Sequence, residues 1–182
     1  LSTHTQTTLA NAQPPPSPRW GGNATLLAFA SSVEFTDVFD APTHPTWRFN
    51  YYYNWTLKAS RYEHLEGQHD KVCRGIAKHP LEQPCTVINS VNGKTYIQFP
   101  NDGYCCVCNL HRWTIRSDWL MSNDTKFLGT VKLHGQDANE WFRQGASDNH
   151  YYTSTDPLYK PIRFMEHKKG GKLKQWDFLS WT

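Results

Sequence analysis

Three of the chain's five cysteines fall within the stretch GYCCVCN, residues 103–109, as Cys105, Cys106 and Cys108. Thiols spaced this closely bind a metal, carry out redox chemistry or form disulfides. Cys73 and Cys85 lie upstream, so four thiolates are available for the tetrahedral shell that zinc prefers. The sequence therefore leaves three chemistries to weigh.

A thioredoxin-like centre needs its C-x-x-C pair at the start of a helix that follows a strand in a βαβ unit. Cys105 and Cys108 have the spacing, but no such unit surrounds them, so redox catalysis is disfavoured. Between zinc and disulfides, the glycosylation signals and the strand pattern described below favour an oxidising compartment, where thiols form disulfides. We predict disulfides and no metal site.

Five cysteines leave at least one thiol over. The simplest scheme joins Cys73 and Cys85 to two of the three clustered cysteines, and the sequence does not determine which two. The remaining thiol is then either buried or available to link two chains.

The compartment is indicated by three N-x-S/T sequons, at Asn23, Asn54 and Asn123. No apolar run approaches the roughly 18 residues that a membrane-spanning helix requires. The chain begins at Leu1 rather than Met, which fits a mature protein whose targeting segment has been removed. These observations predict a secreted, N-glycosylated protein without a membrane span.

The charge balance argues against a nucleic-acid partner. Nineteen basic residues face 16 acidic ones, for a net charge of +3, and both signs are spread along the chain. The one basic run, Lys168 to Lys174, is interrupted by Gly170 and Gly171, which is typical of a solvated hairpin loop.

Aromatic residues make up 14% of the chain and favour the pleated surfaces of β-strands. The composition therefore predicts that strands position the cysteines. From Thr46 to Lys58 large, mostly aromatic side chains alternate with mostly polar ones, which predicts a strand with one buried aromatic face and one solvated face. Asn54 falls on its solvated face. The alternating rings are Trp47, Phe49, Tyr51, Tyr53 and Trp55.

The rest of the chain predicts an antiparallel meander with little helix. Asn92-Gly93 separates two β-rich runs and predicts a two-residue type I′ hairpin turn. Only Ser117 to Leu120 looks like a helix start, for one short turn. Residues 1–19 are polar and Pro-rich and form an extended arm, followed by a single β domain over 20–182. Further strands are predicted at 126–133, 138–143, 149–154, 160–166 and 173–179.

The order of motifs from about Phe35 to Phe178 resembles the ependymin-related family, in the branch with sea-urchin, algal and protist members. The resemblance rests on RFNYYYNWTLKASRYEHL, PCTVINSVNGKTYIQFPNDGYCCVC, SDWL, NEWFRQGASDNHYYTSTDPLYKPIRF and WDFLSW. Branch members often carry a second cysteine pair directly after the cluster, where this chain has Asn109-Leu110, so the family's disulfide pairing is not carried over. The Pro-rich arm lies outside the resemblance.

The resemblance implies a secreted glycoprotein with a LolA-like fold, a curved antiparallel sheet forming a half-barrel whose concave face can enclose a hydrophobic ligand. It brings no catalytic residues and no cofactor. Some family members are linked to calcium, but this chain has no D-x-[DN]-x-[DN]-G loop, so calcium rests on the resemblance alone.

Two functions follow from these features. The first is a non-enzymatic protein that binds a lipid-like ligand on its aromatic face. The second is a structural subunit of an extracellular matrix, coat or filament, assembled through the arm, the edge strands and a spare cysteine. Spacings typical of catalytic motifs are missing from the sequence, so we predict no enzyme. The candidate pocket residues are Trp47, Phe49, Tyr51, Tyr53, Trp55, Tyr96, Phe99, Trp141, Tyr151 and Phe164.

Overall fold

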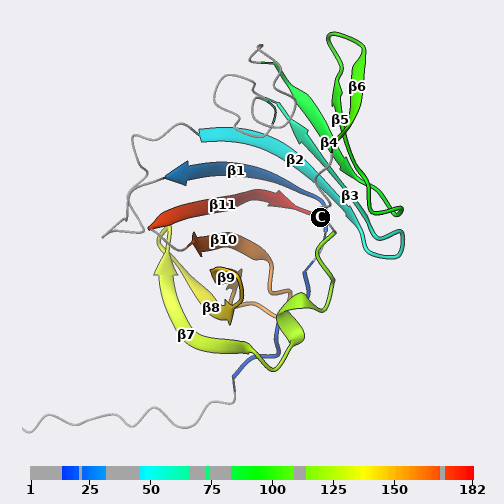
Figure 1. Cartoon of the computed structure of the whole chain (residues 1–182). Helices are drawn as coiled ribbons and strands as arrows, with labels where there is room; N and C mark the ends of the chain where they lie inside the picture. Colours follow the sequence, from blue (N-terminus) through cyan, green and yellow to red (C-terminus); the bar gives the residue numbers. More distant parts are fainter. Residues whose placement is uncertain are drawn as a thin grey trace, which may run out of the picture.

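The computed structural model describes residues 14–20, 22–31, 46–65, 73, 83–108, 114–168 and 171–182. Within these ranges the chain forms eleven strands and one short 3-10 helix, η1 (Figure 1). The elements are β1 (Ala24–Ser31), β2 (Thr46–Asn54), β3 (Ala59–His64), β4 (Cys85–Asn89), β5 (Thr95–Phe99), β6 (Tyr104–Cys108), η1 (Trp119–Met121), β7 (Thr125–Leu133), β8 (Gln136–Gln144), β9 (Asp148–Ser154), β10 (Pro161–Lys168) and β11 (Lys172–Trp181).

All eleven strands belong to one antiparallel sheet in the order β6-β5-β4-β3-β2-β1-β11-β10-β9-β8-β7. Strands that follow one another along the chain pair with each other, except β6 and β7, and the pairing of β1 with β11 joins the first strand to the last. The sheet curves into an open half-barrel, with β6 and β7 at its two edges (Figure 1). The predicted fold class, a curved antiparallel sheet with little helix, is confirmed.

The predicted strands of the C-terminal half are present as β7 to β11, with ends that differ from the predicted ones by at most two residues. The short helical turn expected after Ser117 is η1. The first aromatic strand was predicted too long, because β2 ends at Asn54 and the backbone then turns, with Lys58 N–H donating to the Trp55 carbonyl at 2.9 Å. Lys58 adopts the left-handed conformation that ends the alternation (φ 48°).

The hairpin at Asn92-Gly93 joins β4 to β5 as predicted, but the turn type was wrong. Its loop has three residues, because Ser90 N–H donates to the Lys94 carbonyl (3.0 Å) while Gly93 N–H donates to the Ser90 carbonyl (2.9 Å). Only Gly93 has a positive φ, of 74°, which fits a type I turn closed by a left-handed glycine. The Asn92 side chain accepts a bond from Lys94 N–H and so stabilises this turn.

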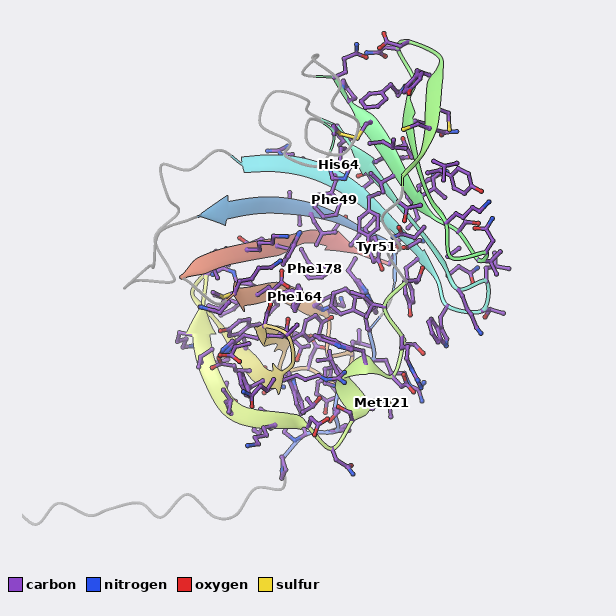
Figure 2. All side chains as sticks on the ribbon, in the orientation of Figure 1. Phe49, Tyr51, His64, Met121, Phe164 and Phe178 are labelled. Atoms are coloured by element: carbon purple, nitrogen blue, oxygen red, sulfur yellow. A yellow bond between two sulfur atoms is a disulfide. The ribbon has the colours of Figure 1, made fainter. Side chains whose placement is uncertain are left out.

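One face of the sheet carries three of the four hydrophobic clusters in the described part of the chain. Strand register places every second residue of each strand on this face, and the side chains of Phe49, Tyr51, Phe164 and Phe178 lie inside the curve of the sheet (Figure 2). We call this the aromatic face. The fourth cluster lies on the opposite face and contains Leu133, Ala138, Tyr152, Met165 and Leu173.

The opposite face is closed at this corner by the turn between β7 and β8. His134 in that turn lies 2.8 Å from a guanidinium nitrogen of Arg163 on β10, and Arg163 is almost fully buried. The same guanidinium donates two hydrogen bonds to the Asp177 carboxylate on β11, and the bond from its terminal nitrogen to Oδ2 is 3.0 Å long. The turn therefore folds over two strands that are not its neighbours in the sheet.

The joint between the chain ends contains a glycine that its surroundings require. Gly22 precedes β1 with a φ of +99°, and a Cβ placed there would lie 2.2 Å from the indole nitrogen of Trp181 at the end of β11. Gly135, in the turn between β7 and β8, also has a positive φ of +77°, but a Cβ there would meet nothing within 4 Å.

We predict that Gly22→Ala lowers the free energy of unfolding by more than Gly135→Ala. Both substitutions place alanine in an unfavourable backbone conformation, at a cost of about 1–3 kcal/mol, but only the first must also displace the Trp181 ring. Urea unfolding of the two variants beside the wild type measures the difference. Equal losses would contradict the role assigned to the contact between Gly22 and Trp181.

Candidate aromatic binding face

A row of rings crosses five neighbouring strands of the aromatic face. Phe127 on β7 lies opposite Trp141 on β8, which lies opposite Tyr151 on β9, and the row continues to Phe164 and Trp176. Neighbouring ring centroids are 5.1 Å apart for Phe127 and Trp141 and again for Phe164 and Trp176. These separations are typical of favourable aromatic pairs.

The row continues across the β1–β11 joint into the N-terminal strands. Leu26 on β1 lies opposite Phe178 on one side and Phe49 on the other. Tyr51 on β2 lies opposite Tyr62 on β3, with ring centroids 4.8 Å apart. The aromatic face is therefore continuous from β7 to β3.

Trp20, the residue that follows the Pro-rich arm, covers the centre of this face. Its ring lies 5.5 Å from both Tyr151 and Phe164 and 5.7 Å from Trp119 of η1. Its backbone N–H donates to the Ser117 carbonyl at 2.9 Å, and its indole N–H donates to the Tyr51 hydroxyl at 3.3 Å. We call Trp20, Trp119 and Leu120 the cover.

Arg143 on β8 holds the second part of the cover in place. Its guanidinium donates to the Trp119 carbonyl and lies over the Trp119 ring, 5.1 Å from the ring centroid. A cation over an indole face adds to the hydrogen bond at this point. The cover is thus attached to the sheet at two places, through Tyr51 and through Arg143.

Three phenols of the aromatic face, those of Tyr51, Tyr53 and Tyr151, have raised pKa values and are neutral. Burial raises the pKa of Tyr51 far above its ordinary value, and burial likewise raises the pKa of Tyr151. Burial, with a smaller contribution from the Asp118 carboxylate, raises the pKa of Tyr53 to about 12, and its hydroxyl donates to the Ile115 carbonyl at 2.8 Å. The face therefore presents rings and neutral hydroxyls, which suits apolar or weakly polar molecules.

The other half of the aromatic face is closed by a disulfide between Cys73 and Cys85, with both residues buried against Val87, Ile97 and Phe99. The predicted scheme, in which these two cysteines bond to the clustered ones, is wrong. Cys85 lies on β4 while Cys105 and Cys106 lie on β6, and β5 runs between them. Two strand spacings amount to about 9–10 Å, more than a disulfide can span.

The clustered cysteines point to different sides of β6. Cys106 lies opposite Ile97 and packs at the margin of the buried cluster, whereas Cys105 lies opposite Gln98 and is exposed. Neither forms a disulfide. The side chain of Cys108 lies outside the described residues.

Most of the predicted pocket residues lie on the aromatic face: Phe49, Tyr51, Tyr53, Phe99, Trp141, Tyr151 and Phe164. Two do not. Trp55 lies in the turn after β2, and Tyr96 points to the opposite face, in register with Ile88 and Val107. The side chain of Trp47 lies outside the described residues.

Sequence reasoning missed Trp20, Trp119, Phe127, Trp176 and Phe178. Phe127, Trp176 and Phe178 lie in predicted strands, so the alternation along those strands could have placed them on the buried face. Trp20 and Trp119 carry no such signal, because neither belongs to a strand.

The three sequon asparagines are exposed. The Asn23 side-chain oxygen accepts a hydrogen bond from Tyr53 N–H at 3.2 Å, and that of Asn54 accepts one from Leu57 N–H at 3.0 Å. In both cases the oxygen is held by the backbone, and the residue itself lies at the surface. Asn123 lies in the turn between η1 and β7.

No family model matches the chain, and no curated protein sequence matches it. Among solved structures it is similar to an uncharacterized conserved protein from Thermus thermophilus, at 12% identity over 89% of this chain and 80% of that one, with a TM-score of 0.49. It is also similar to the lipoprotein LppX of Mycobacterium tuberculosis (7% identity, 88% and 86% covered, TM-score 0.41). A third is a putative outer membrane lipoprotein-sorting protein domain from Vibrio parahaemolyticus (8% identity, 88% and 84% covered, TM-score 0.40).

The described residues contain no helix long and apolar enough to cross a membrane. They also contain no group of three or more histidine, cysteine or acidic side chains placed to hold a metal ion.

We predict that Trp20→Ala lowers the free energy of unfolding by about 3–5 kcal/mol, as expected for removing a buried indole. The matched control is Leu158→Ala, an exposed position, which we expect to change stability by no more than about 0.5 kcal/mol. Denaturant unfolding followed by tryptophan fluorescence gives both values. A loss below about 1 kcal/mol for Trp20→Ala would show that Trp20 is not an integral part of the core.

Proposed function

We propose that this protein is an exported, non-enzymatic binding protein that holds an apolar, lipid-like ligand on its aromatic face. The observation that carries the proposal is the row of rings from Phe127 to Trp176, which lies inside the curve of the sheet and is covered by Trp20 and one helical turn. Concave, mostly aromatic surfaces with few polar groups are the usual setting for small apolar ligands.

The cover is suited to open without unfolding the sheet. Trp20 and η1 lie outside the strand ladder, and Trp20 is fixed by one backbone hydrogen bond and one side-chain bond of 3.3 Å. Segments with few backbone hydrogen bonds open at a lower free energy than strands within a sheet. An apolar ligand that enters below the cover would replace the contacts of Trp20 with Tyr151 and Phe164 by its own contacts with these rings.

The proposed compartment is extracellular. Disulfides persist in oxidising environments, and the bond between Cys73 and Cys85 supports such a location. The exposed positions of Asn23, Asn54 and Asn123 support glycosylation of all three. We also propose that the chain belongs to the ependymin-related family, on the motifs given above.

We expect the delipidated protein to bind N-phenyl-1-naphthylamine, a fluorescent apolar probe, saturably and with a blue shift. Phe164→Leu removes a ring from the centre of the face and should weaken binding by about two- to tenfold. Tyr96→Leu, the same kind of change on the opposite face, should bind as the wild type does. Fluorescence titration gives the dissociation constants, and an absence of saturable uptake by the wild type would contradict the proposal.

A second function, self-assembly in an extracellular structure, is favoured by the β6 edge. Tyr104 is 49% exposed and Val107 55% exposed, and the exposed thiol of Cys105 lies between them. Edge strands are normally protected by charged side chains or proline, and Tyr104 to Cys108 contains neither. A second copy could therefore extend the sheet by antiparallel pairing with β6.

If β6 pairs with its copy, oxidised glutathione should convert the protein to a disulfide-linked dimer. Two Cys105 thiols then form one disulfide while one molecule of oxidised glutathione is reduced to two of glutathione. Cys105→Ser should abolish the dimer, whereas Cys106→Ser, altering a thiol on the aromatic face, should not. Non-reducing electrophoresis and sedimentation measure this, and a monomer at high concentration with or without oxidant would exclude assembly through β6.

A further inference from the structure

Two buried polar atoms on the aromatic face make no hydrogen bond within the described part of the chain. They are the indole nitrogen of Trp141 and the hydroxyl of Thr153, in residues that are 2% and 0% exposed. A buried donor without a partner is costly, and most such groups in native proteins are satisfied. These two atoms therefore call for a ligand.

The two residues lie diagonally across neighbouring strands. Trp141 on β8 is directly opposite Tyr151 on β9, and Thr153 is two residues further along β9 on the same face. Diagonal neighbours in an antiparallel pair are about 7–8 Å apart, within reach of long side chains. One functional group between them can meet both the indole N–H and the hydroxyl.

The neighbouring polar side chain, that of Asn139, already makes hydrogen bonds to other groups. Asn139, directly opposite Thr153, accepts a bond from the Thr130 hydroxyl at 3.3 Å and donates to the Ser154 carbonyl at 3.3 Å. Its amide satisfies neither Trp141 nor Thr153. The other neighbours along the row, Phe127 and Tyr151, present rings.

The chemistry of the pair determines the ligand class. An indole N–H only donates, so the ligand atom must be an acceptor. The only cation of β8 is Arg143, which lies two residues from Trp141 on the side away from Thr153 and is bound to the Trp119 carbonyl. Burying a carboxylate without a partner is strongly unfavourable, which leaves a neutral oxygen.

We infer that Trp141 and Thr153 anchor the neutral oxygen of an apolar ligand, such as a ketone, ester, ether or alcohol oxygen. This inference rests on the proposed function, because it names the polar end of a ligand held on the same face. The hydrocarbon part then lies along the ring row below the cover, while the oxygen pairs with the indole N–H and the Thr153 hydroxyl.

The test compares decan-2-one with n-decane as competitors of N-phenyl-1-naphthylamine, using the full chain and the variants Trp141→Phe and Thr153→Val. Thr153→Val removes one donor at nearly unchanged shape, whereas Trp141→Phe removes the other donor together with one ring of the indole. We expect Thr153→Val to weaken decan-2-one binding by about three- to tenfold and to leave n-decane binding within about twofold of the wild type. Trp141→Phe should weaken both competitors, and decan-2-one about three- to tenfold more than n-decane.

A stability comparison checks that the hydroxyl is unpaired in the unliganded protein. Thr95 is also fully buried, but its hydroxyl donates to Asn89 at 3.1 Å. Thr95→Val should lower the urea midpoint, because it leaves Asn89 without that donor, whereas Thr153→Val should leave the midpoint unchanged or raise it.

The outcomes separate the anchor from the proposed function. If both competitors bind and the variants weaken neither selectively, the anchor is wrong and the proposed function stands. If Thr153→Val destabilises the protein as much as Thr95→Val, its hydroxyl is bonded in the native protein and the anchor is again wrong. If neither competitor nor the probe binds the wild type, the proposed function fails, and the anchor fails with it.

Discussion

The pairing of β1 with β11 is the constraint on which the rest of the structure depends. It joins two meanders, β1 to β6 and β7 to β11, into one sheet (Figure 1). The strands run side by side from Ala24 to Ser31, and backbone bonds of 2.8 and 2.9 Å between Asn23 and Thr182 extend the joint beyond them. Without it the ring row would end at Phe178, and Phe49 and Tyr51 would belong to a separate, smaller core.

Both faces of the sheet are packed near β10 and β11. The β7–β8 turn lies over the opposite face, where His134 meets Arg163 and Asp177. Arg163 is buried with a bidentate partner, and removing one member of such a pair costs more than the pair itself contributes. This polar contact fixes where the turn lies, while the adjoining apolar cluster supplies most of the burial.

The aromatic face is the opposite case, because rings dominate it and its one described guanidinium, that of Arg143, is bound to the Trp119 carbonyl. Rings on a concave surface must be shielded from water, and Trp20 with η1 provides that shield in the structure. The cover consists of two short segments, and two side-chain hydrogen bonds, to Tyr51 and from Arg143, attach it to the sheet. The same few contacts therefore keep water from the rings and would have to break for a ligand to reach them. The unpaired donors of Trp141 and Thr153 lie on the face that this cover shields.

The sequence by itself determined β2, the β4–β5 hairpin and β7 to β11, since a period of two is a local property of the chain, whereas β1 and β6 were not predicted. The alternation of Phe49, Tyr51 and Tyr53 predicted a buried aromatic face, and Asn92-Gly93 predicted a hairpin at the right place. Only the tertiary structure decided which residues meet across the sheet and which lie over it. Strand order places β5 between Cys85 and the cysteines of β6, and the folding of the chain end over the curved sheet places Trp20 on Tyr151. The residues next to these positions do not encode strand order or sheet curvature, because both arise from pairing between distant parts of the chain.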